Sequence, residues 1–332
     1  MKLRPIMVCA FLASLVFLAV PGVSAESLQH AKLQKEFARL TRGFDGRVGI
    51  CVRDSSGVTC VNGGRRFPLQ SVMKLLVSIA VLDAVDQRGW KLTDLVVLRK
   101  EDLSLAVQPL ARLLTEDGFH TTIDDLVRRA IVDSDSAAAD FLVARLGGPT
   151  VVQSTLDRHR VIGVRFDRDE RHLQTEIVGV EWRPEFVDSE LLAREDQAVP
   201  EARRDAAFRK YQNDPRDTAT PRGMAALLQR LAEGKLLSET STKRLLEIMG
   251  QTKTGPDRLK AGVPRGWSLA HKTGTSGTWQ GVTAATNDVG ILTAPNGKFI
   301  SVVVFIADSR AEAKNMAKLM ADIARVTIEN YR

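Results

Sequence analysis

The distribution of strand-like and helix-like segments along the chain most limits how it can fold. Strand-like patterns lie near both ends, at 47–62 and at 267–276, 286–293 and 299–307, whereas residues from about 90 to 250 are mainly helical in pattern. We therefore expect an α/β fold with an antiparallel sheet formed from both chain ends and flanked by helices. An all-α domain is inserted between those ends, and the cleft between the two parts is the expected place for an active site.

The N-terminal segment 1–25 is typical of a secretory signal peptide. A basic start precedes an apolar run over 6–20, and the small residues at 23–25 match a cleavage site. An uncleaved membrane anchor is the alternative reading, but the run is short for a membrane span. We therefore expect a periplasmic or secreted protein that begins near Glu26 and has no membrane attachment after cleavage.

The remaining chain is predicted to form two domains. Residues 26–66 plus 252–332 would form the α/β domain, and residues 67–251 the all-helical domain. The formal net charge of +7 is mildly basic, and no run of Lys and Arg is typical of a nucleic-acid-binding surface. The histidines are scattered and do not combine with cysteines at metal-ligand spacing. We therefore expect no nucleic-acid partner, no metal and no cofactor.

Two cysteines flank a predicted hairpin turn. Cys51 and Cys60 lie on either side of the turn signal at 54–57. A regular hairpin would bring them opposite each other on adjacent strands, where a disulfide is geometrically feasible. The alternative is two small buried hydrophobic residues, and the sequence leaves both open.

A lysine in an otherwise apolar helix is the first sign of chemistry. The segment 71–88 is apolar on nearly all sides, which is typical of a buried helix, and Lys74 lies in its first turn. Ser71 precedes it by three residues and lies on the same face. A desolvated lysine has a lowered pKa and can accept the proton of a hydroxyl group. The alternative is a helix-capping serine with a lysine that extends to solvent.

Three further polar clusters follow along the chain. The group 134–136 (Ser-Asp-Ser) precedes a helical stretch, and its alternative role is helix capping. The charged segment 166–174 is either a solvated face or a loop whose carboxylate holds a water molecule as a base. The segment 271–275 (His-Lys-Thr-Gly-Thr) lies on a predicted edge strand, where its lysine and threonines would offer donors to a carboxylate.

The order of these motifs resembles that of the class A serine β-lactamases. The resemblance extends from about residue 27 to the C-terminus, apart from one insertion. The stretches that carry it are GRRFPLQSVMK, DRDERHLQ, RDTATPRGMAALL, RLKAGVPRGW, HKTGTSGT and TNDVGIL.

The resemblance implies a role for each matching residue. The catalytic residues would be the nucleophile Ser71, its activator Lys74, the proton shuttle Ser134 and the water-activating base Glu170. The substrate-binding residues would be Ser136, Gln174, Arg258, Lys272, Thr273, Gly274 and Thr275. Backbone N–H groups of Ser71 and Thr275 would form the oxyanion hole. A monomer that hydrolyses a small β-lactam through an acyl-serine intermediate is the implied function.

Two positions and one insertion depart from the family pattern. Ser136 and Gln174 each replace an asparagine of the family, so substrate contact and water placement are expected to differ. Arg168 and Asp217 match the ion pair that closes the family's Ω-type loop, which here spans 166–221. That loop carries an insertion at about 176–213, which is either a tolerated surface insertion or a lid or partner surface.

Two other functions remain as alternatives. A DD-peptidase-like acyl-serine enzyme would use the same serine and lysine, but such peptidases lack the loop carboxylate that Glu170 supplies here. A non-catalytic binding protein on the same fold would use the insertion as its interface. Such a protein has no chemical reason to keep all five of the residues Ser71, Lys74, Ser134, Glu170 and Lys272.

Overall fold

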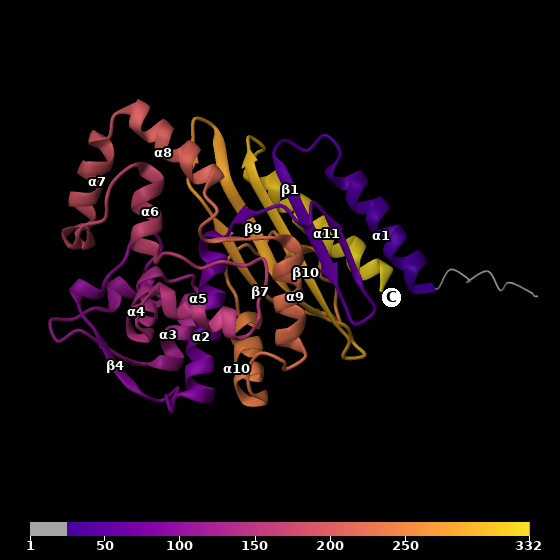
Figure 1. Ribbon diagram of the computed structural model, residues 1–332, viewed down its shortest axis with the longest axis horizontal. Coiled ribbons are helices and arrows are strands. Elements are labelled where there is room, and N and C mark those ends of the chain that lie inside the picture. The colour runs from indigo at the N-terminus through magenta and orange to yellow at the C-terminus, as the bar shows by residue number, and fades with distance from the viewer. Residues whose placement is uncertain (1–24, 332) are drawn as a thin grey trace, which may run out of the picture.

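The computed structural model describes residues 25–331, so the predicted signal peptide lies outside the described residues except for Ala25. Within this range the predicted fold class is confirmed. An antiparallel sheet built from both ends of the chain lies beside a mainly helical part formed by its middle (Figure 1).

The main sheet has six strands, whose central members come from the C-terminal part of the chain. Its order is β2-β1-β10-β9-β7, and β8 pairs with β9. The strands are β1 (Arg47–Arg53), β2 (Val58–Val61), β7 (Ser268–Thr275), β8 (Thr278–Trp279), β9 (Val282–Thr293) and β10 (Phe299–Ser309). The edge position predicted for the strand that carries Lys272 is confirmed, because β7 pairs only with β9.

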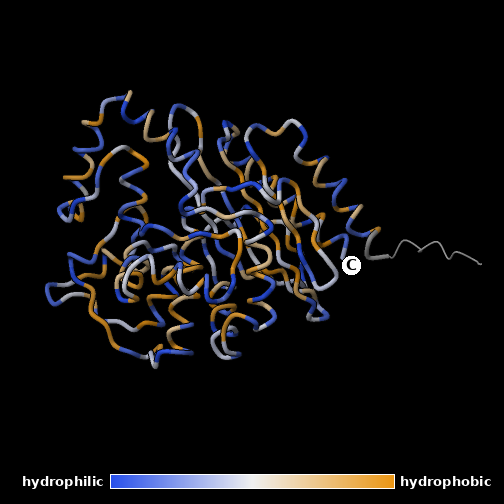
Figure 2. Tube along the Cα trace, in the orientation of Figure 1, coloured by the Kyte–Doolittle hydropathy of each residue, from blue (hydrophilic) through white to orange (hydrophobic). Residues whose placement is uncertain are grey.

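Helices cover both faces of this sheet. On one face, α1 (Ala25–Thr41) and α11 (Ala313–Asn330) bury Phe37 and Met320 against strand residues such as Val302. On the other face, α9 (Pro221–Ala232) packs against β1 and β10. Figure 2 shows hydrophobic residues along the central strands. Because helices cover both faces, β9 and β10 are buried along nearly their whole length.

The middle of the chain folds around one buried helix. Its α-helices are α2 (Met73–Gln87), α3 (Ile123–Val132), α4 (Ser136–Leu146), α5 (Pro149–Arg158), α6 (Glu170–Val178), α7 (Ser189–Ala198), α8 (Glu201–Asn213) and α10 (Glu239–Gly250). Short 3₁₀ segments are η1 (Gln70–Val72), η2 (Lys100–Asp102), η3 (Pro109–Leu113), η4 (Pro184–Val187) and η5 (Leu259–Gly262). Every residue of α2 from Met73 to Ala84 is buried, as its apolar pattern predicted.

The expectation that residues 67–251 are entirely helical needs a correction. The strands β4 (Leu95–Leu98) and β5 (Phe119–Thr122) pair with each other, and β3 (Phe67–Pro68) pairs with β6 (Thr218–Ala219). The β4–β5 pair is rich in β-branched and aromatic residues, which favour strands. Segments this short do not produce a periodic pattern that distinguishes them from loops.

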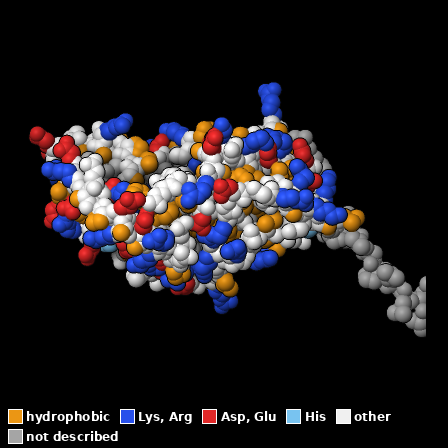
Figure 3. Space-filling model, turned by 90° about the horizontal axis from the view of Figure 1, so that it is seen from above, with side chains coloured by type: hydrophobic (Ala, Val, Ile, Leu, Met, Phe, Trp, Pro, Cys, Tyr) orange, Lys and Arg blue, Asp and Glu red, His pale blue; other side chains and the backbone are white. Residues whose placement is uncertain are grey.

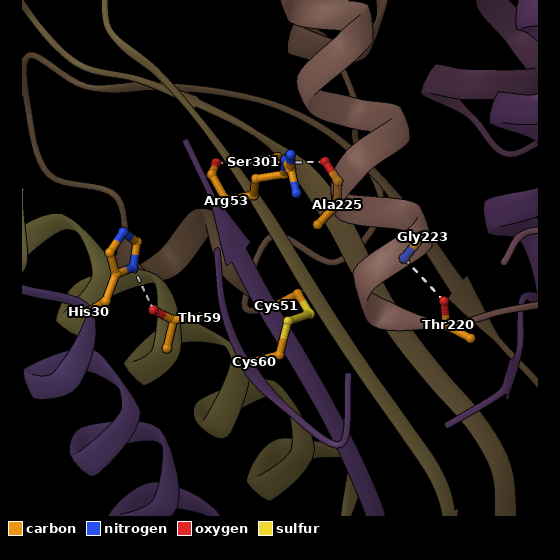
Figure 4. The surroundings of a disulfide bond; sticks show 9 residues. All are labelled: His30, Cys51, Arg53, Thr59, Cys60, Thr220, Gly223, Ala225 and Ser301. Carbon is orange, nitrogen blue, oxygen red and sulfur yellow. Dashed lines mark hydrogen bonds between the residues drawn. A yellow bond between two sulfur atoms is a disulfide. The ribbon is translucent and has the colours of Figure 1, made fainter. Parts of the chain in front are cut away.

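The hairpin cysteines form a disulfide. Cys51 lies directly opposite Cys60 in the β1–β2 register, and their Cα atoms are 4.2 Å apart. In Figure 4 the bond lies on the sheet near His30, whose Nδ1 lies 2.7 Å from the Thr59 hydroxyl oxygen. The disulfide and this contact hold β2, the far edge of the sheet, to β1 and to helix α1.

The insertion forms ordered helices rather than a long irregular loop. The predicted ion pair at its base is confirmed, because Arg168 Nε lies 2.7 Å from Asp217 Oδ2 although the residues are 49 positions apart. Helices α7 and α8 extend from this base, and α8 packs against α6. On the face seen in Figure 3, Lys and Arg side chains are interspersed with Asp and Glu.

Candidate active site

The predicted nucleophile and its lysine lie at the start of the buried helix α2. Ser71 is in η1, directly before α2, and Lys74 is in the first turn of the helix. Lys74 Nζ donates a hydrogen bond to Ser71 Oγ at 2.9 Å. The Lys74 side chain is only 1% exposed, so its ammonium group does not reach bulk solvent.

The buried ammonium group is compensated by a carboxylate. Lys74 Nζ lies 2.8 Å from Glu170 Oε1, and both side chains are 1% exposed. It also donates to Ser136 Oγ at 3.2 Å. Burial raises the pKa of Glu170, but the charge and hydrogen bond of Lys74 outweigh burial and hold that pKa below its usual value. Glu170 is therefore held as a carboxylate beside the serine–lysine pair.

A second lysine faces the second serine. Lys272 Nζ donates to Ser134 Oγ and to the Thr273 carbonyl oxygen, each at 3.0 Å. Ser134 has a left-handed backbone with φ of 59°, which turns the chain just before α4. Burial and then the charge of Lys74 hold the pKa of Lys272 well below its usual value. Two cationic side chains from different parts of the fold thus converge on one site.

The third residue of the Ser-Asp-Ser group does not face open space. Ser136 is 1% exposed, and its hydroxyl accepts a hydrogen bond from Lys74. Asp135 does cap α4, because its side chain accepts from the Ala138 N–H at 3.0 Å and from the Leu110 N–H at 2.7 Å. Capping and site formation are therefore combined in one tripeptide.

Glu170 is positioned by the start of helix α6. Its N–H donates to Asp140 Oδ1 at 2.9 Å, and Asp169 caps the helix. One turn later, Gln174 Nε2 donates to Glu170 Oε2 at 2.9 Å. The glutamine predicted at a water-holding position therefore contacts the carboxylate itself.

The edge strand β7 approaches the nucleophile closely at Gly274. A Cβ atom at this position would lie 3.2 Å from the Ser71 nitrogen and 3.1 Å from the Val72 nitrogen, and it would collide with the Leu69 carbonyl oxygen. Only glycine permits this approach. The backbone of β7 and the N–H of Ser71 are thereby brought to the same side of the site.

The predicted carboxylate-binding groups gather on the next residues of β7. Thr275 is exposed, and its Oγ1 accepts from Arg258 Nη2 at 2.7 Å. Arg258 is held by a second hydrogen bond, from Nη1 to the Asn287 carbonyl oxygen at 2.9 Å. The Thr273 hydroxyl is buried and pairs with the Thr254 hydroxyl at 2.5 Å. Arg258 and Thr275 thus form an accessible pair of donors beside the buried lysines.

Two contributors to this site were not predicted as site residues. Asp140 accepts the Glu170 N–H, and Tyr211 accepts a hydrogen bond from Gln70, the residue before the nucleophile. Sequence signals for both exist. Asp140 is a lone carboxylate in an apolar helix, and Tyr211 follows Phe208 by three residues in an otherwise charged helix.

Known proteins resemble this chain over most of its length. The family model described as "Beta-lactamase enzyme family" matches residues 32–331. "Beta-lactamase VEB-1" of Pseudomonas aeruginosa is 29% identical over 307 residues, which is 91% of this chain and 91% of the relative. "Extended-spectrum beta-lactamase PER-1" of the same organism is 30% identical over 306 residues, covering 91% of this chain and 88% of the relative.

Solved structures show the same likeness in three dimensions. The TLA-1 extended-spectrum β-lactamase superposes with a TM-score of 0.75 at 25% identity, covering 91% of this chain and 99% of the other. An ancestral (GNCA) class A β-lactamase superposes with a TM-score of 0.72 at 31% identity, covering 90% and 99%. The matched region includes every residue that the preceding paragraphs place in the site.

Proposed function

The chain belongs to the beta-lactamase enzyme family and is a serine β-lactamase of class A, and we propose that Ser71 is its nucleophile, with Lys74, Ser134 and Glu170 as the proton-transfer groups. The observation that carries this assignment is the contact of Lys74 with both Ser71 (2.9 Å) and Glu170 (2.8 Å) in one buried site. A serine hydroxyl is a weak nucleophile unless such a neighbour accepts its proton.

Acylation begins with attack of Ser71 Oγ on the carbonyl carbon of the β-lactam ring. The Lys74 ammonium passes one of its protons to the Glu170 carboxylate, and its nitrogen then accepts the hydroxyl proton of Ser71, so the serine proton is balanced by one new proton on Glu170. The developing oxyanion is stabilised by the N–H groups of Ser71 and Thr275, which the close approach at Gly274 brings together.

Ring opening requires a proton for the leaving nitrogen. We assign this proton to the hydroxyl of Ser134, which is oriented by Lys272 Nζ at 3.0 Å. The positive charge of Lys272, together with Arg258 and Thr275, attracts the carboxylate that β-lactam substrates carry. As the C–N bond breaks, the nitrogen gains that proton and Ser71 keeps the acyl group. Ser134 regains a proton from Lys272, and the proton that Ser71 had released returns to Lys272, so the base of the next step is again ionised.

Deacylation uses Glu170 as the base that takes a proton from water. The contact with Lys74 keeps Glu170 ionised, which this role requires, and the Gln174 amide fixes one of its oxygens. Water then attacks the acyl carbon, and the proton on Glu170 returns to the Ser71 oxygen as the product leaves. Gln174 thus takes part in placing the attacking water.

The proposed residues come from both predicted domains of a single chain. Ser71, Lys74, Ser134 and Glu170 belong to the helical part, and Lys272 belongs to the sheet. Because one chain supplies the complete site, we propose that the enzyme is a monomer. Among residues 25–331, no helix is both long enough and apolar enough to cross a membrane. The signal-like N-terminus supports a periplasmic or secreted location.

The assignment is tested by trapping the acyl-enzyme. We expect Ser71→Ala to abolish the covalent penicillin adduct in mass spectrometry and the turnover of a chromogenic cephalosporin. Ser78→Ala is the matched control, because this buried hydroxyl lies on the same helix and bonds to the Lys74 carbonyl oxygen. It should still form the adduct. If penicillin still labelled Ser71→Ala at another residue, the assignment of Ser71 as the nucleophile would be wrong.

The base is tested by a second substitution. We expect Glu170→Ala to form the penicillin adduct and to retain it, because the group that activates water is missing. Mass spectrometry over time measures the adduct. If Glu170→Ala released product at the rate of the unaltered enzyme, Glu170 would have no role in deacylation.

A further inference from the structure

A tyrosine from the insertion reaches the residue that precedes the nucleophile. Tyr211 lies in α8, is 4% exposed, and accepts a hydrogen bond from Gln70 Nε2 at 2.5 Å. Gln70 is 1% exposed and adjoins Ser71. The two partners are 141 positions apart in the sequence. The insertion is therefore in direct contact with the catalytic segment.

The contact continues to the carboxylate of Glu170. Gln174 Nε2 donates to Gln70 Oε1 at 3.2 Å and to Glu170 Oε2 at 2.9 Å. The four side chains of Tyr211, Gln70, Gln174 and Glu170 thus form one hydrogen-bonded row. It begins on the insertion and ends at the group that activates water.

The direction of each hydrogen bond in this row follows from the charge at its end. An ionised carboxylate only accepts, so Gln174 must turn its NH₂ group toward Glu170. The same nitrogen faces Gln70, which must therefore present its carbonyl oxygen. The NH₂ group of Gln70 is then left facing Tyr211, whose hydroxyl oxygen is its acceptor. Without that acceptor, a buried donor loses its partner.

Gln70 also has a backbone that needs support. Its φ of 49° is left-handed, a conformation that is unfavourable for residues other than glycine. Its side chain is held at both ends, by Tyr211 and by Gln174. Loss of one contact frees the amide to rotate, and a rotated amide would present its NH₂ group to that of Gln174.

Tyr211 is itself fixed from the opposite side of the site. Helix α8 is tied to the sheet by hydrogen bonds from Trp279 Nε1 to Asp205 (2.5 Å) and from Gln280 to Glu201 (2.9 Å) (Figure 1). A cavity of about 380 Å³ lies along α8 and is partly lined by Tyr211. Tyr211 therefore lines this pocket and also accepts the hydrogen bond from Gln70.

We propose that Tyr211 is a positioning residue for deacylation, which acts through Gln70 and Gln174 to fix the carboxylate of Glu170. The inference rests on the proposed role of Glu170 as the water-activating base. It assigns a function to part of the insertion. The Tyr211 hydroxyl would align the attacking water through the hydrogen-bonded side chains of Gln70 and Gln174. Acylation should change little when Tyr211 leaves the row, because Ser71 still contacts Lys74 and Lys74 still contacts Glu170.

The test is Tyr211→Phe, followed through single turnovers by rapid-quench mass spectrometry. We expect the rate of acyl-enzyme loss to fall about tenfold, which corresponds to one buried donor left without its partner. The rate of acyl-enzyme formation should stay within about twofold, since the contact between Ser71 and Lys74 is retained.

The chain offers a matched control in its second tyrosine. Tyr331→Phe removes the same hydroxyl at the end of α11, away from the row, and should leave both rates unchanged. In a Gln70→Ala background, Tyr211→Phe should cause no further slowing, because the connection to Gln174 is already lost. Thermal midpoints of all variants report whether packing alone has changed.

Two results would overturn the inference. One is an unchanged rate of acyl-enzyme loss in Tyr211→Phe. The other is an equal slowing by Tyr211→Phe with and without Gln70→Ala, which would place its effect elsewhere. Glu170→Ala is measured in parallel. If Glu170→Ala deacylates normally, the proposed function of Glu170 is wrong. If Glu170→Ala accumulates acyl-enzyme while Tyr211→Phe behaves like the unaltered enzyme, only the proposed role of Tyr211 is wrong.

Discussion

Two buried lysines with different partners occupy one site. Lys74 is paired with the carboxylate of Glu170, whereas Lys272 has only neutral acceptors, the Ser134 hydroxyl and the Thr273 carbonyl. A buried ammonium without an anion has a lowered pKa. In the free enzyme the charge of Lys74 is therefore balanced by Glu170, whereas a substrate carboxylate would balance the charge of Lys272.

The lowered pKa of Lys272 predicts a pH effect. As pH rises through that pKa, Lys272 loses its charge, so kcat/KM for a carboxylate-bearing β-lactam should fall on the alkaline side. We expect Lys272→Arg to move this fall to higher pH, because arginine stays protonated. Lys318→Arg, at a side chain that is 72% exposed, is the control and should leave the profile unchanged. An alkaline fall at the same pH in Lys272→Arg would contradict the assignment.

Sequence reasoning located most of these site residues but not their connections. Ser71 and Lys74 were found because a lone charge in an apolar helix is physically unusual. Tyr211 and Gln70 are joined across 141 positions, and no local pattern reports such a contact. Asp140 carries the same signal as Lys74, a lone charge in an apolar helix, but its partner is the backbone N–H of Glu170, 30 positions away, and no local pattern identifies that partner.

Among the structural elements, the base of the insertion is held by a buried arginine. Arg168 is 7% exposed and donates to Asp217 at 2.7 Å and to Glu176 at 2.6 Å. Asp217 Oδ1 also accepts the N–H groups of Asp167 (2.6 Å) and Arg168 (3.0 Å). One aspartate thus fixes both the side chain and the backbone just before Glu170.

Removal of that aspartate should be costly. We expect Asp217→Ala to lower the free energy of unfolding by about 3 kcal/mol, because a buried arginine loses its closest fully buried partner. Lys235→Ala breaks an exposed ion pair with Glu233 and should cost less than about 1 kcal/mol. Urea titrations measure both. Equal effects of the two substitutions would show that burial does not govern the Arg168–Asp217 pair.

Long periodic elements were predicted well, and short ones were not. The helix expected at 71–88 and the hairpin expected at 47–62 lie within a few residues of their predicted positions. Strand β9 begins at Val282, earlier than the predicted 286, because its first residues are small and weakly patterned. The β4–β5 pair was missed because each strand has only four residues, which is too short for a clear period, although their β-branched and aromatic residues favour strands.

At the scale of the whole molecule, the disulfide and the active site lie at opposite edges of the sheet. Cys60 is on β2, and the substrate-facing residues are on β7, with β1, β10 and β9 between them. The cross-link joins β2 to β1, so two strands, β10 and β9, lie between it and the strand that carries Lys272.

This separation predicts that reduction changes stability but not turnover. The bond closes a loop with a sequence separation of 9, for which loop entropy gives about 2.5 kcal/mol. We expect the reduced protein to unfold in correspondingly less urea and to hydrolyse a chromogenic cephalosporin at the same rate under native conditions. A loss of turnover on reduction, with the protein still folded, would show that the two edges are coupled.

The strand order determines when the main sheet can form during synthesis. The N-terminal hairpin is hydrogen-bonded to β10, and β7 is bonded to β9, so neither side of the sheet can join the central strands until the last part of the chain has been synthesised. Such distant pairing is slow to nucleate. A newly made polypeptide would stay without its sheet while the ribosome completes it. The signal-like N-terminus predicts export, and a chain whose sheet forms this late would still be unfolded when it crosses a membrane.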